Sequence, residues 1–178
     1  MKIITNLLAT TLLVYSGMVM SELTKQPAEK LRIATFNVSM EALNYLPSTS
    51  DKTVYVKGNE LALALAKNHQ QIRNIAEIIQ RVNPDIILLN EFDGNDEEHQ
   101  SLKLFLSQYL AKSQQGNAAV NYPYFYQGPV NNGVATGYDL NNDGKSGQLP
   151  EDAYGYGHFS GHFAMALLSK YPINVDKI

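Results

Sequence analysis

The order of apolar and polar residues predicts a chain that mixes strands and helices. Apolar runs rich in β-branched or aromatic residues are typical of buried strands. Such runs predict strands over 31–38, 85–90, 122–126 and 163–169. The stretches 39–58 and 128–161 are rich in turn-forming residues and lack periodicity, which predicts two long loops.

Apolar residues spaced three and four apart predict a helix over 60–82. Pro84 ends it, because proline cannot continue a helix without losing a hydrogen bond. A further helix is predicted to begin near Asn95, with Glu98 completing a capping box. The core-facing residues are expected to be Ile72, Ile75, Ala76, Ile79 and Val82 in the first helix, and Leu102, Phe105, Leu106 and Tyr109 in the second.

Two of the predicted strands end on a side chain that carries an oxygen. Asn37 lies next to the end of the first, and Glu91 directly follows the second. Sites in layered α/β folds lie at such strand ends, and carboxylate and amide oxygens are ligands that Mg²⁺ prefers. Taken singly, Glu91 is also explained as an exposed carboxylate and Asn37 as a turn former.

Composition limits the classes of protein to consider. The 178 residues, of which 44% are hydrophobic and 17% charged, suit one compact domain with one core. The formal net charge of -3 argues against a nucleic-acid binder that relies on a general basic field, although a local groove or bound metal would still hold phosphate. The absence of cysteine excludes disulfides, thiolate metal sites, cysteine nucleophiles and an acylated lipoprotein cysteine.

The amino terminus has the pattern of a secretory signal peptide. Met1-Lys2 gives a positive start to a mostly apolar stretch, and Val19 and Ser21 suit a cleavage site. We predict a signal peptide over 1–21, a polar linker over 22–30, and a secreted or periplasmic location. An uncleaved anchor is the competing interpretation, but the stretch is only about as long as a minimal span of ~17–25 residues. No stable membrane span is expected after cleavage.

Three blocks of sequence follow one another in a specific order. They are RIATFNV (32–38), NPDIILLNE (83–91) and SGHFAMALLSKYPI (160–173). Together they resemble the endonuclease/exonuclease/phosphatase superfamily, the DNase I-like proteins. The resemblance implies an α/β (α+β) fold, a four-layered sandwich in which helices flank two packed β-sheets.

The same resemblance implies a metal-dependent site. Glu91 corresponds to a direct ligand of Mg²⁺ or Mn²⁺, and Asn37 to a residue beside the metal and the scissile phosphate. The implied substrates are phosphate esters, whether nucleic acid, phospholipid or a small phosphate ester. This makes Asn37 and Glu91 the candidate catalytic and metal-binding residues.

The chain also departs from the family pattern. Family members carry a later Asp-x-Asn motif and an Asp-His pair, and neither follows Ile173. We therefore interpret 31–178 as the amino-terminal part of such a domain, incomplete at the carboxyl terminus. A sheet face without its covering layer is costly, so we expect a fragment that is inactive and poorly stable by itself.

A polar segment resembles the opening of a calcium-binding loop, because oxygen-bearing residues alternate before a glycine. Its candidate ligands are Asp139, Asn141, Asp143, Lys145 and Glu151. The loop position that normally holds the closing carboxylate is Pro150, and no helix is predicted on either side. A polar turn explains the same residues, and we favour the turn over a Ca²⁺ site.

Histidines and tyrosines in this part of the chain each have two interpretations. His158 and His162 lie four apart in a glycine-rich stretch, which favours a loop or substrate-facing role over a shared zinc ion. Six tyrosines lie between Tyr122 and Tyr156. Such a cluster could stack on a base or sugar, but the core interpretation is favoured.

Two functions of different classes follow from these observations. The first is a secreted, divalent-metal-dependent phosphoesterase that hydrolyses phosphodiesters or phosphomonoesters, with Glu91 on the metal and Asn37 on the phosphate. The second is a non-catalytic secreted module for calcium binding or adhesion, built on the Asp139 loop and the tyrosine-rich surface. The sequence predicts neither the oligomeric state nor the choice among phosphate-ester substrates.

Overall fold

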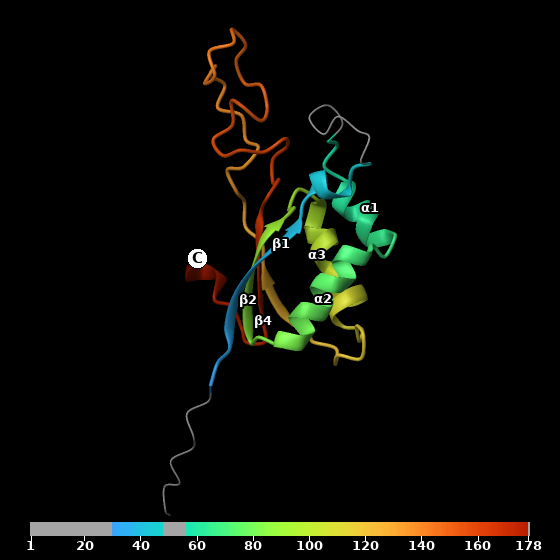
Figure 1. The fold of residues 1–178 in the computed structure, drawn as a ribbon. Helices are drawn as coiled ribbons and strands as arrows, with labels where there is room; N and C mark the ends of the chain where they lie inside the picture. Colours follow the sequence, from blue (N-terminus) through green and yellow to red (C-terminus); the bar gives the residue numbers. More distant parts are fainter. Residues whose placement is uncertain (1–29, 48–55, 178) are drawn as a thin grey trace, which may run out of the picture. The chain divides into compact units, whose positions relative to one another are not determined.

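The computed structural model describes residues 30–47 and 56–177, whose strands form one mixed sheet (Figure 1). Their order in the sheet is β1 (Ile33–Met40), β2 (Ile86–Phe92), β4 (Met165–Ser169) and β3 (Tyr124–Tyr126). β1 and β2 run parallel, whereas β4 is antiparallel to both β2 and β3. The four predicted strands are confirmed, although their ends differ by a few residues.

The helix predicted over 60–82 is two helices, α1 (Glu60–Ala66) and α2 (Gln70–Val82). The chain turns between them at Asn68, whose φ of 55° lies in the left-handed region that asparagine tolerates. Apolar spacing continues across this turn, which explains why the pattern predicted one helix. A second left-handed residue, Asn83, directly follows α2 as its C-cap, with a φ of 48°.

The remaining helical segments are short. They are the 3-10 turns Ala42–Tyr45, Glu97–His99 and Val175–Lys177, helix α3 (Gln100–Leu104), and the π-helical turn Phe105–Leu110 that continues α3. The predicted capping box of Asn95 and Glu98 is wrong, because the Asn95 side chain donates to the Gly58 carbonyl at 2.7 Å. The Asp96 carboxylate instead accepts the Ser101 N–H, in the first turn of α3, at 2.6 Å.

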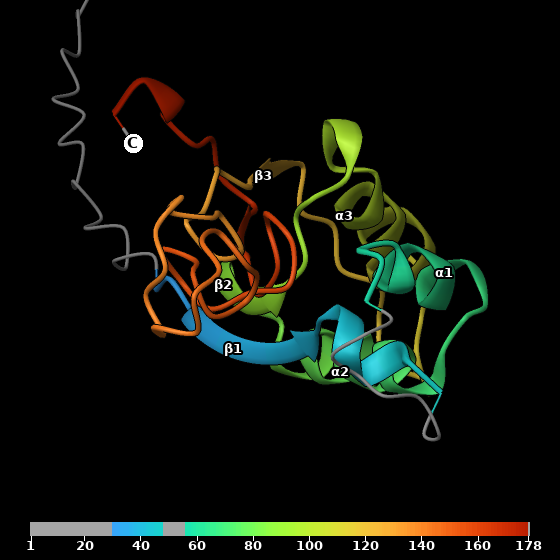
Figure 2. The ribbon, with the colours of Figure 1, turned by 90° about the horizontal axis from the view of Figure 1, so that it is seen from above.

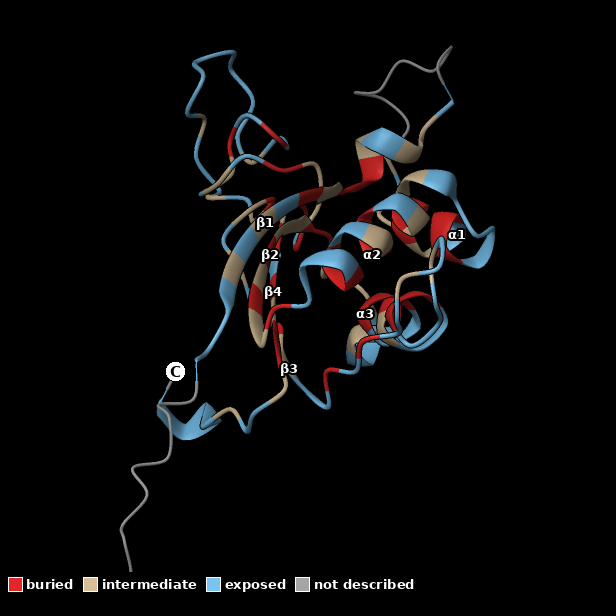
Figure 3. Cartoon of the chain, turned by 60° about the horizontal axis from the view of Figure 1, so that its bottom comes forward, coloured by how far each residue is buried: buried red, intermediate tan, exposed pale blue. Residues whose placement is uncertain are grey.

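The helices cover one face of the sheet, and the core lies between the two layers (Figures 2 and 3). The buried side chains include Val38, Met40, Ile87, Leu89, Ala166 and Leu168 from the sheet and Ile72, Ile75, Ala76, Ile79, Leu102, Phe105 and Tyr109 from the helices. Val82 and Leu106 were also expected there. Val82 is instead 44% exposed, because α2 ends at this residue, and Leu106 is only partly buried.

The opposite face of the sheet is much more exposed among the described residues. Ile33 of β1 is 69% exposed, Met165 of β4 is 47% exposed, and Tyr124 of β3 is 40% exposed. They alternate with core residues, because successive side chains of a strand point to opposite faces. This α/β architecture, one mixed sheet with helices, is consistent with the DNase I-like fold. The second sheet that the resemblance implies is not among the described residues.

The predicted signal peptide, 1–21, lies outside the described residues, as does nearly all of the predicted linker. Within the described part of the chain, no helix combines the length and the apolar character needed to cross a membrane. The prediction of a signal peptide therefore stays a prediction.

Candidate active site

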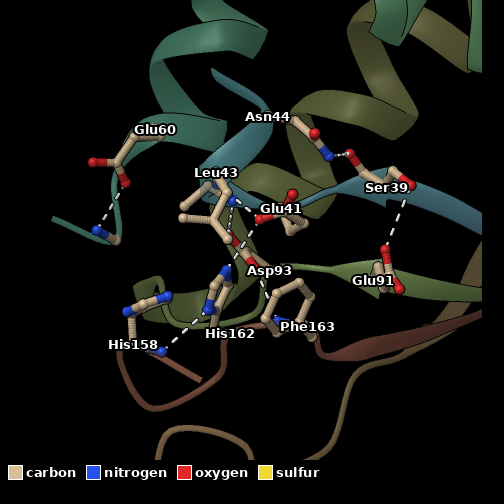
Figure 4. A network of polar contacts seen from close by, with 12 residues as sticks. Ser39, Glu41, Leu43, Asn44, Glu60, Glu91, Asp93, His158, His162 and Phe163 are labelled. Carbon is tan, nitrogen blue, oxygen red and sulfur yellow. Dashed lines mark hydrogen bonds and ion pairs between the residues drawn. The ribbon is translucent and has the colours of Figure 1, made fainter. Parts of the chain in front are cut away.

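Asn37 and Glu91 lie close together near the carboxyl ends of β1 and β2, although β1 continues to Met40 and β2 to Phe92. Asn37 is paired with Asn90 in the register of the two parallel strands, so Glu91 follows at the same edge of the sheet. Ser39 joins them, because its hydroxyl oxygen lies 3.2 Å from Asn37 Oδ1 and 3.4 Å from Glu91 Oε2. Figure 4 shows the contact between Ser39 and Glu91. The structure thus brings the two candidate residues together through a hydroxyl group.

The regular pairing of the two strands breaks at this point. β1 holds one residue more than β2 just before Met40 pairs with Phe92, which is the arrangement of a β-bulge. Ser39 and Glu91 both have positive φ angles, of 47° and 55°. This conformation costs a non-glycine residue ~1 kcal/mol or more. Backbone strain is therefore concentrated in two adjacent strands at the candidate site, where a functional constraint would explain it.

A pocket of 790 Å³ opens at these strand ends. Its described lining comprises the amides Asn37, Asn90, Asn131 and Asn132, the carboxylate Glu91, and the apolar or aromatic residues Pro129, Val130, Tyr156, Phe163 and Met165. Residues 128–162, here called the pocket loop, supply half of this lining and stand over the ends of β1 and β2 (Figures 1 and 2). Among the described lining residues, Glu91 alone carries a formal charge.

Backbone hydrogen bonds order the pocket loop. The Tyr154 N–H donates to the Val134 carbonyl at 2.9 Å, and the Gly133 N–H donates to the Gly155 carbonyl at 2.8 Å. Gly133 has a φ of 68°, and a Cβ atom there would lie 1.8 Å from the Phe159 carbonyl oxygen. Only glycine fits this position. The glycine-rich composition that predicted a loop therefore also permits the loop to pack closely on itself.

A buried polar network lies next to the pocket (Figure 4). His162 is fully buried, and its Nδ1 accepts the His158 backbone N–H at 3.2 Å. Its Nε2 therefore carries the proton and donates to Glu41 Oε2 at 3.1 Å. Glu41 also accepts the Leu43 N–H at 2.7 Å. His162 lies in a loop, as predicted, but it is fully buried and therefore does not face a substrate. Its two engaged ring nitrogens leave no atom for a zinc ion.

Asp93 links three chain segments beside the site through hydrogen bonds. It is 3% exposed, and its two oxygens accept the Ala42 N–H at 2.8 Å and the Phe163 N–H at 3.0 Å. The ends of β1 and β2 and the entry to β4 are thereby connected, two residues beyond Glu91. Burial raises the pKa of Asp93 to about 7, while His162 and the two N–H donors act in the opposite direction.

The segment that resembles the opening of a calcium loop folds into a series of polar turns. The Asp139 carboxylate accepts the N–H groups of Asp143 and Gly144 at 3.1 and 2.8 Å, and Asp143 accepts the Lys145 N–H at 2.9 Å. Glu151 is exposed. Among the described residues, no group of three or more histidine, aspartate or glutamate side chains is placed to share a metal ion. These bonds belong to the turn interpretation, and the calcium interpretation stays a prediction.

The six tyrosines range from core to surface, and Tyr124 and Tyr126 lie between the extremes at 40% exposed and half-buried. Tyr122 is 3% exposed, and its hydroxyl donates to the Pro84 carbonyl at 2.9 Å, so the core interpretation is confirmed for this residue. For Tyr138, Tyr154 and Tyr156 it is wrong, because they are between 60% and 71% exposed. They belong to the pocket loop, which packs through its backbone instead of an apolar core. Of these three, Tyr156 lines the pocket.

The donors at the strand ends suit a hard divalent cation. Asn37 offers an amide oxygen and Glu91 a carboxylate, and both line the pocket. Mg²⁺ in phosphate-handling sites is commonly held by one or two carboxylates, with water and phosphate oxygens completing its shell. A small set of protein oxygens is therefore compatible with such an ion, and the Ser39 hydroxyl adds one more within reach of both.

A mixed α/β domain with an oxygen-lined pocket at parallel strand ends is an arrangement typical of enzymes. The chain belongs to the Endonuclease/Exonuclease/phosphatase family, whose family model matches residues 34–178. The resemblance drawn from three sequence blocks is thereby confirmed, and it makes the chain a phosphoesterase- or nuclease-type domain. No curated protein and no solved structure matches the chain.

Sequence reasoning did not select Ser39, Phe163 or Tyr156 as residues of the site. Ser39 lies two positions after Asn37, where a regular strand would put it on the same face, and this spacing was the available signal. Phe163 lies within the third sequence block, and Tyr156 lies just before it. No local pattern separates Tyr156 from the other exposed tyrosines, so its place at the pocket comes from the path of the loop.

Proposed function

We propose that this protein is a secreted, divalent-metal-dependent phosphoesterase domain that binds Mg²⁺ or Mn²⁺ and a phosphate ester at the ends of β1 and β2. The observation that carries the proposal is that Asn37 and Glu91, which both line an open pocket, each lie within 3.4 Å of the Ser39 hydroxyl. Family membership supports the same class of chemistry. The substrate is a nucleic acid, a phospholipid or a small phosphate ester.

Each residue has a distinct part in the proposed site. Glu91 holds the cation through its carboxylate, and Asn37 positions the phosphate beside it. A bound cation neutralises charge that develops on phosphoryl oxygens and lowers the pKa of water. Ser39 holds the two oxygen-bearing side chains in place, because its N–H donates to Asn37 Oδ1 at 3.0 Å and its hydroxyl donates to Glu91 Oε2 at 3.4 Å. Asp93 fixes the strand ends that carry them. Such supporting bonds keep a site close to its binding geometry before the ligand arrives.

We further propose that the chain by itself binds metal but has no turnover. Hydrolysis of a phosphate ester needs a group that activates water or protonates the leaving oxygen. Among the described lining residues, the titratable groups are Glu91, which holds the metal, and the Tyr156 phenol. His162 does not supply this function, because both of its ring nitrogens are occupied by Glu41 and His158.

Metal binding provides the test. Isothermal titration of the chain with Mg²⁺ should show binding that Glu91→Gln weakens by about tenfold or more, because the substitution removes the ligand charge. The matched control is Glu97→Gln, an exposed carboxylate outside this pocket, which should bind like the wild type. Circular dichroism should show that both variants fold.

Two results would contradict the proposal. Equal Mg²⁺ affinity of the wild type and Glu91→Gln would remove the metal site. Rapid Mg²⁺-dependent hydrolysis of bis(p-nitrophenyl) phosphate by the chain alone would overturn the expected lack of turnover. The proposed secreted or periplasmic location rests on the apolar stretch in 1–21. Expression in a secreting host checks that location, because retention of the chain in the cytoplasm would refute it. The mass of the exported protein shows whether 1–21 is removed.

A further inference from the structure

Two aromatic rings form part of the pocket wall. Phe163 and Tyr156 both line the pocket, with their ring centroids 6.2 Å apart and an angle of 36° between the ring planes. Phe163 is half-buried, and Tyr156 is 60% exposed. Packing of the core does not require these rings to be accessible at a polar pocket. Accessible aromatic surface in a pocket is instead typical of ligand binding.

The position of the Phe163 ring is fixed by its backbone and by stacking on His162. Its backbone has a φ of 55°, which bulky residues rarely adopt, and its N–H is held by the Asp93 carboxylate at 3.0 Å. The ring is stacked on His162 with centroids 3.8 Å apart, and His162 is in turn stacked on Phe159 at 4.6 Å. A ring supported in this way loses little freedom when a ligand binds to it.

The Tyr156 ring packs against the ring of His158. The two rings meet in a T-shaped contact with centroids 5.6 Å apart, and the tyrosine hydroxyl lies 3.5 Å from His158 Nε2. By contrast Tyr154, two residues earlier, is 66% exposed and is not among the lining residues. The pocket loop therefore presents one of two neighbouring tyrosines to the site.

The other part of the wall carries amides and no cation. Asn131 and Asn132 line the pocket, and their side chains make no hydrogen bond to another described residue. An amide offers both donors and an acceptor, as the edges of nucleobases do. No lysine or arginine is among the described lining residues. This lining does not suit a polyanionic duplex, whose binding depends on many cationic contacts.

We infer that Tyr156 and Phe163 form a stacking platform that selects phosphate esters carrying an unpaired nucleobase, such as a nucleotide or the end of a single strand. The inference rests on the proposed function, because the phosphate is placed at Asn37 and Glu91 in the same pocket. Stacking accepts any base, since every base has a π-face. A phospholipid headgroup has no flat ring for this platform, and the bases of a duplex are already paired.

Two probes and two variants test the platform. The probes are 2-aminopurine riboside 5′-monophosphate, whose fluorescence is quenched by stacking, and ribose 5-phosphate, which lacks the base. With Mg²⁺ present, the wild type should bind the nucleotide about fivefold or more tightly than the sugar phosphate, with quenching. Tyr156→Leu should remove most of that preference and leave the affinity for ribose 5-phosphate unchanged.

Tyr154→Leu is the matched control and should behave like the wild type. Because Tyr156 is largely exposed, its substitution should not unfold the chain, and circular dichroism melts check this. Equal affinity of the wild type for the two probes, unchanged in Tyr156→Leu, would overturn the platform even if phosphate binding needs Mg²⁺. A base preference that is lost in Tyr156→Leu but needs neither Mg²⁺ nor Glu91 would support the platform and refute the metal site.

Discussion

Within β2 and the residues just after it, two regions of the molecule can be compared directly. Ile87 and Leu89 are at most 2% exposed and pack beneath the helices. Glu91, two residues further on, has a φ of 55° and contacts the Ser39 hydroxyl, and Asp93 is a buried carboxylate. The first pair follows the alternation of a regular strand, and the second pair departs from it.

The two regions also differ in energy. Burying a leucine or isoleucine side chain stabilises a fold by ~1.5–3 kcal/mol. A left-handed non-glycine residue costs ~1 kcal/mol or more, and a buried carboxylate adds a desolvation cost that its hydrogen bonds offset. Burial on the covered face of the sheet therefore stabilises the fold, whereas the strained backbone and the buried carboxylate at the strand ends destabilise it. Such local cost concentrated at one place is typical of functional sites.

The largest expected effect tests the covered face. Leu89→Ala should lower the free energy of unfolding by ~2–5 kcal/mol, because Leu89 is fully buried and the truncation leaves a cavity. The matched substitution is Leu88→Ala, which faces the opposite side of the same strand and is only half-buried. It should cost ~1 kcal/mol. Urea unfolding measures both, and equal losses would show that the helix layer does not separate the two faces.

The second prediction concerns Asp93 at the strand end. Its pKa of about 7 in the fold lies above the ordinary 3.8, so the folded state holds the proton more tightly than the unfolded state. The stability from this group is present at low pH and is lost as pH rises to about 7, a change of ~2–4 kcal/mol. Burial lowers the pKa of His158, which works in the opposite direction below its ordinary 6.5.

The difference between the wild type and Asp93→Asn isolates the carboxyl group, because His158 is common to both proteins. Urea unfolding at several pH values from about 4 to about 8 should show that this difference changes with pH and levels off above the pKa of Asp93. A difference independent of pH would mean that Asp93 has the same proton affinity in the folded and unfolded chain. Burial of the Asp93 carboxyl group would then destabilise the fold equally at neutral and at acidic pH.

The smallest expected effect concerns the strain at the bulge. Ser39→Gly and Ser39→Ala both remove the hydroxyl, but only glycine accepts the φ of 47° without strain. The glycine variant should therefore be more stable than the alanine variant by ~0.5–1 kcal/mol, despite its more flexible unfolded chain. Thermal unfolding measures the difference. An alanine variant as stable as the glycine variant would show that the strand end stores no strain at Ser39.

The elements that the sequence predicted well are those that depend on local periodicity. Alternating or continuous apolar residues predicted all four strands, and spacings of three and four predicted most of the buried helix face. The turn at Asn68 escaped prediction, because apolar spacing continues through it. The prediction that Asn95 caps the second helix was wrong, because the Asn95 side chain donates a hydrogen bond to the carbonyl of Gly58, which is distant in the sequence. Local preference decided the first group, and a distant partner decided the last.

The site was predictable to a similar extent. Asn37 and Glu91 could be selected because each closes an apolar strand within a sequence block of the family. Their contact through Ser39 depends on a bulge that shifts the register, and no local pattern marks that bulge. The tyrosines show the same limit, because Tyr154 and Tyr156 have similar neighbours and similar exposure but only one of them lines the pocket.

The sequence by itself determined the family, the order of strands and helices along the chain, and the oxygen-bearing residues at two strand ends. The tertiary structure alone decided which groups meet. His162 reaches Glu41 across 121 residues, and Phe163 reaches Asp93 across 70. The spacing of apolar residues can be read from a short stretch of sequence, because it reflects which face of a single helix or strand is buried. Hydrogen bonds between distant segments depend on register, bulges and loop path, which take shape only when the whole sheet has packed.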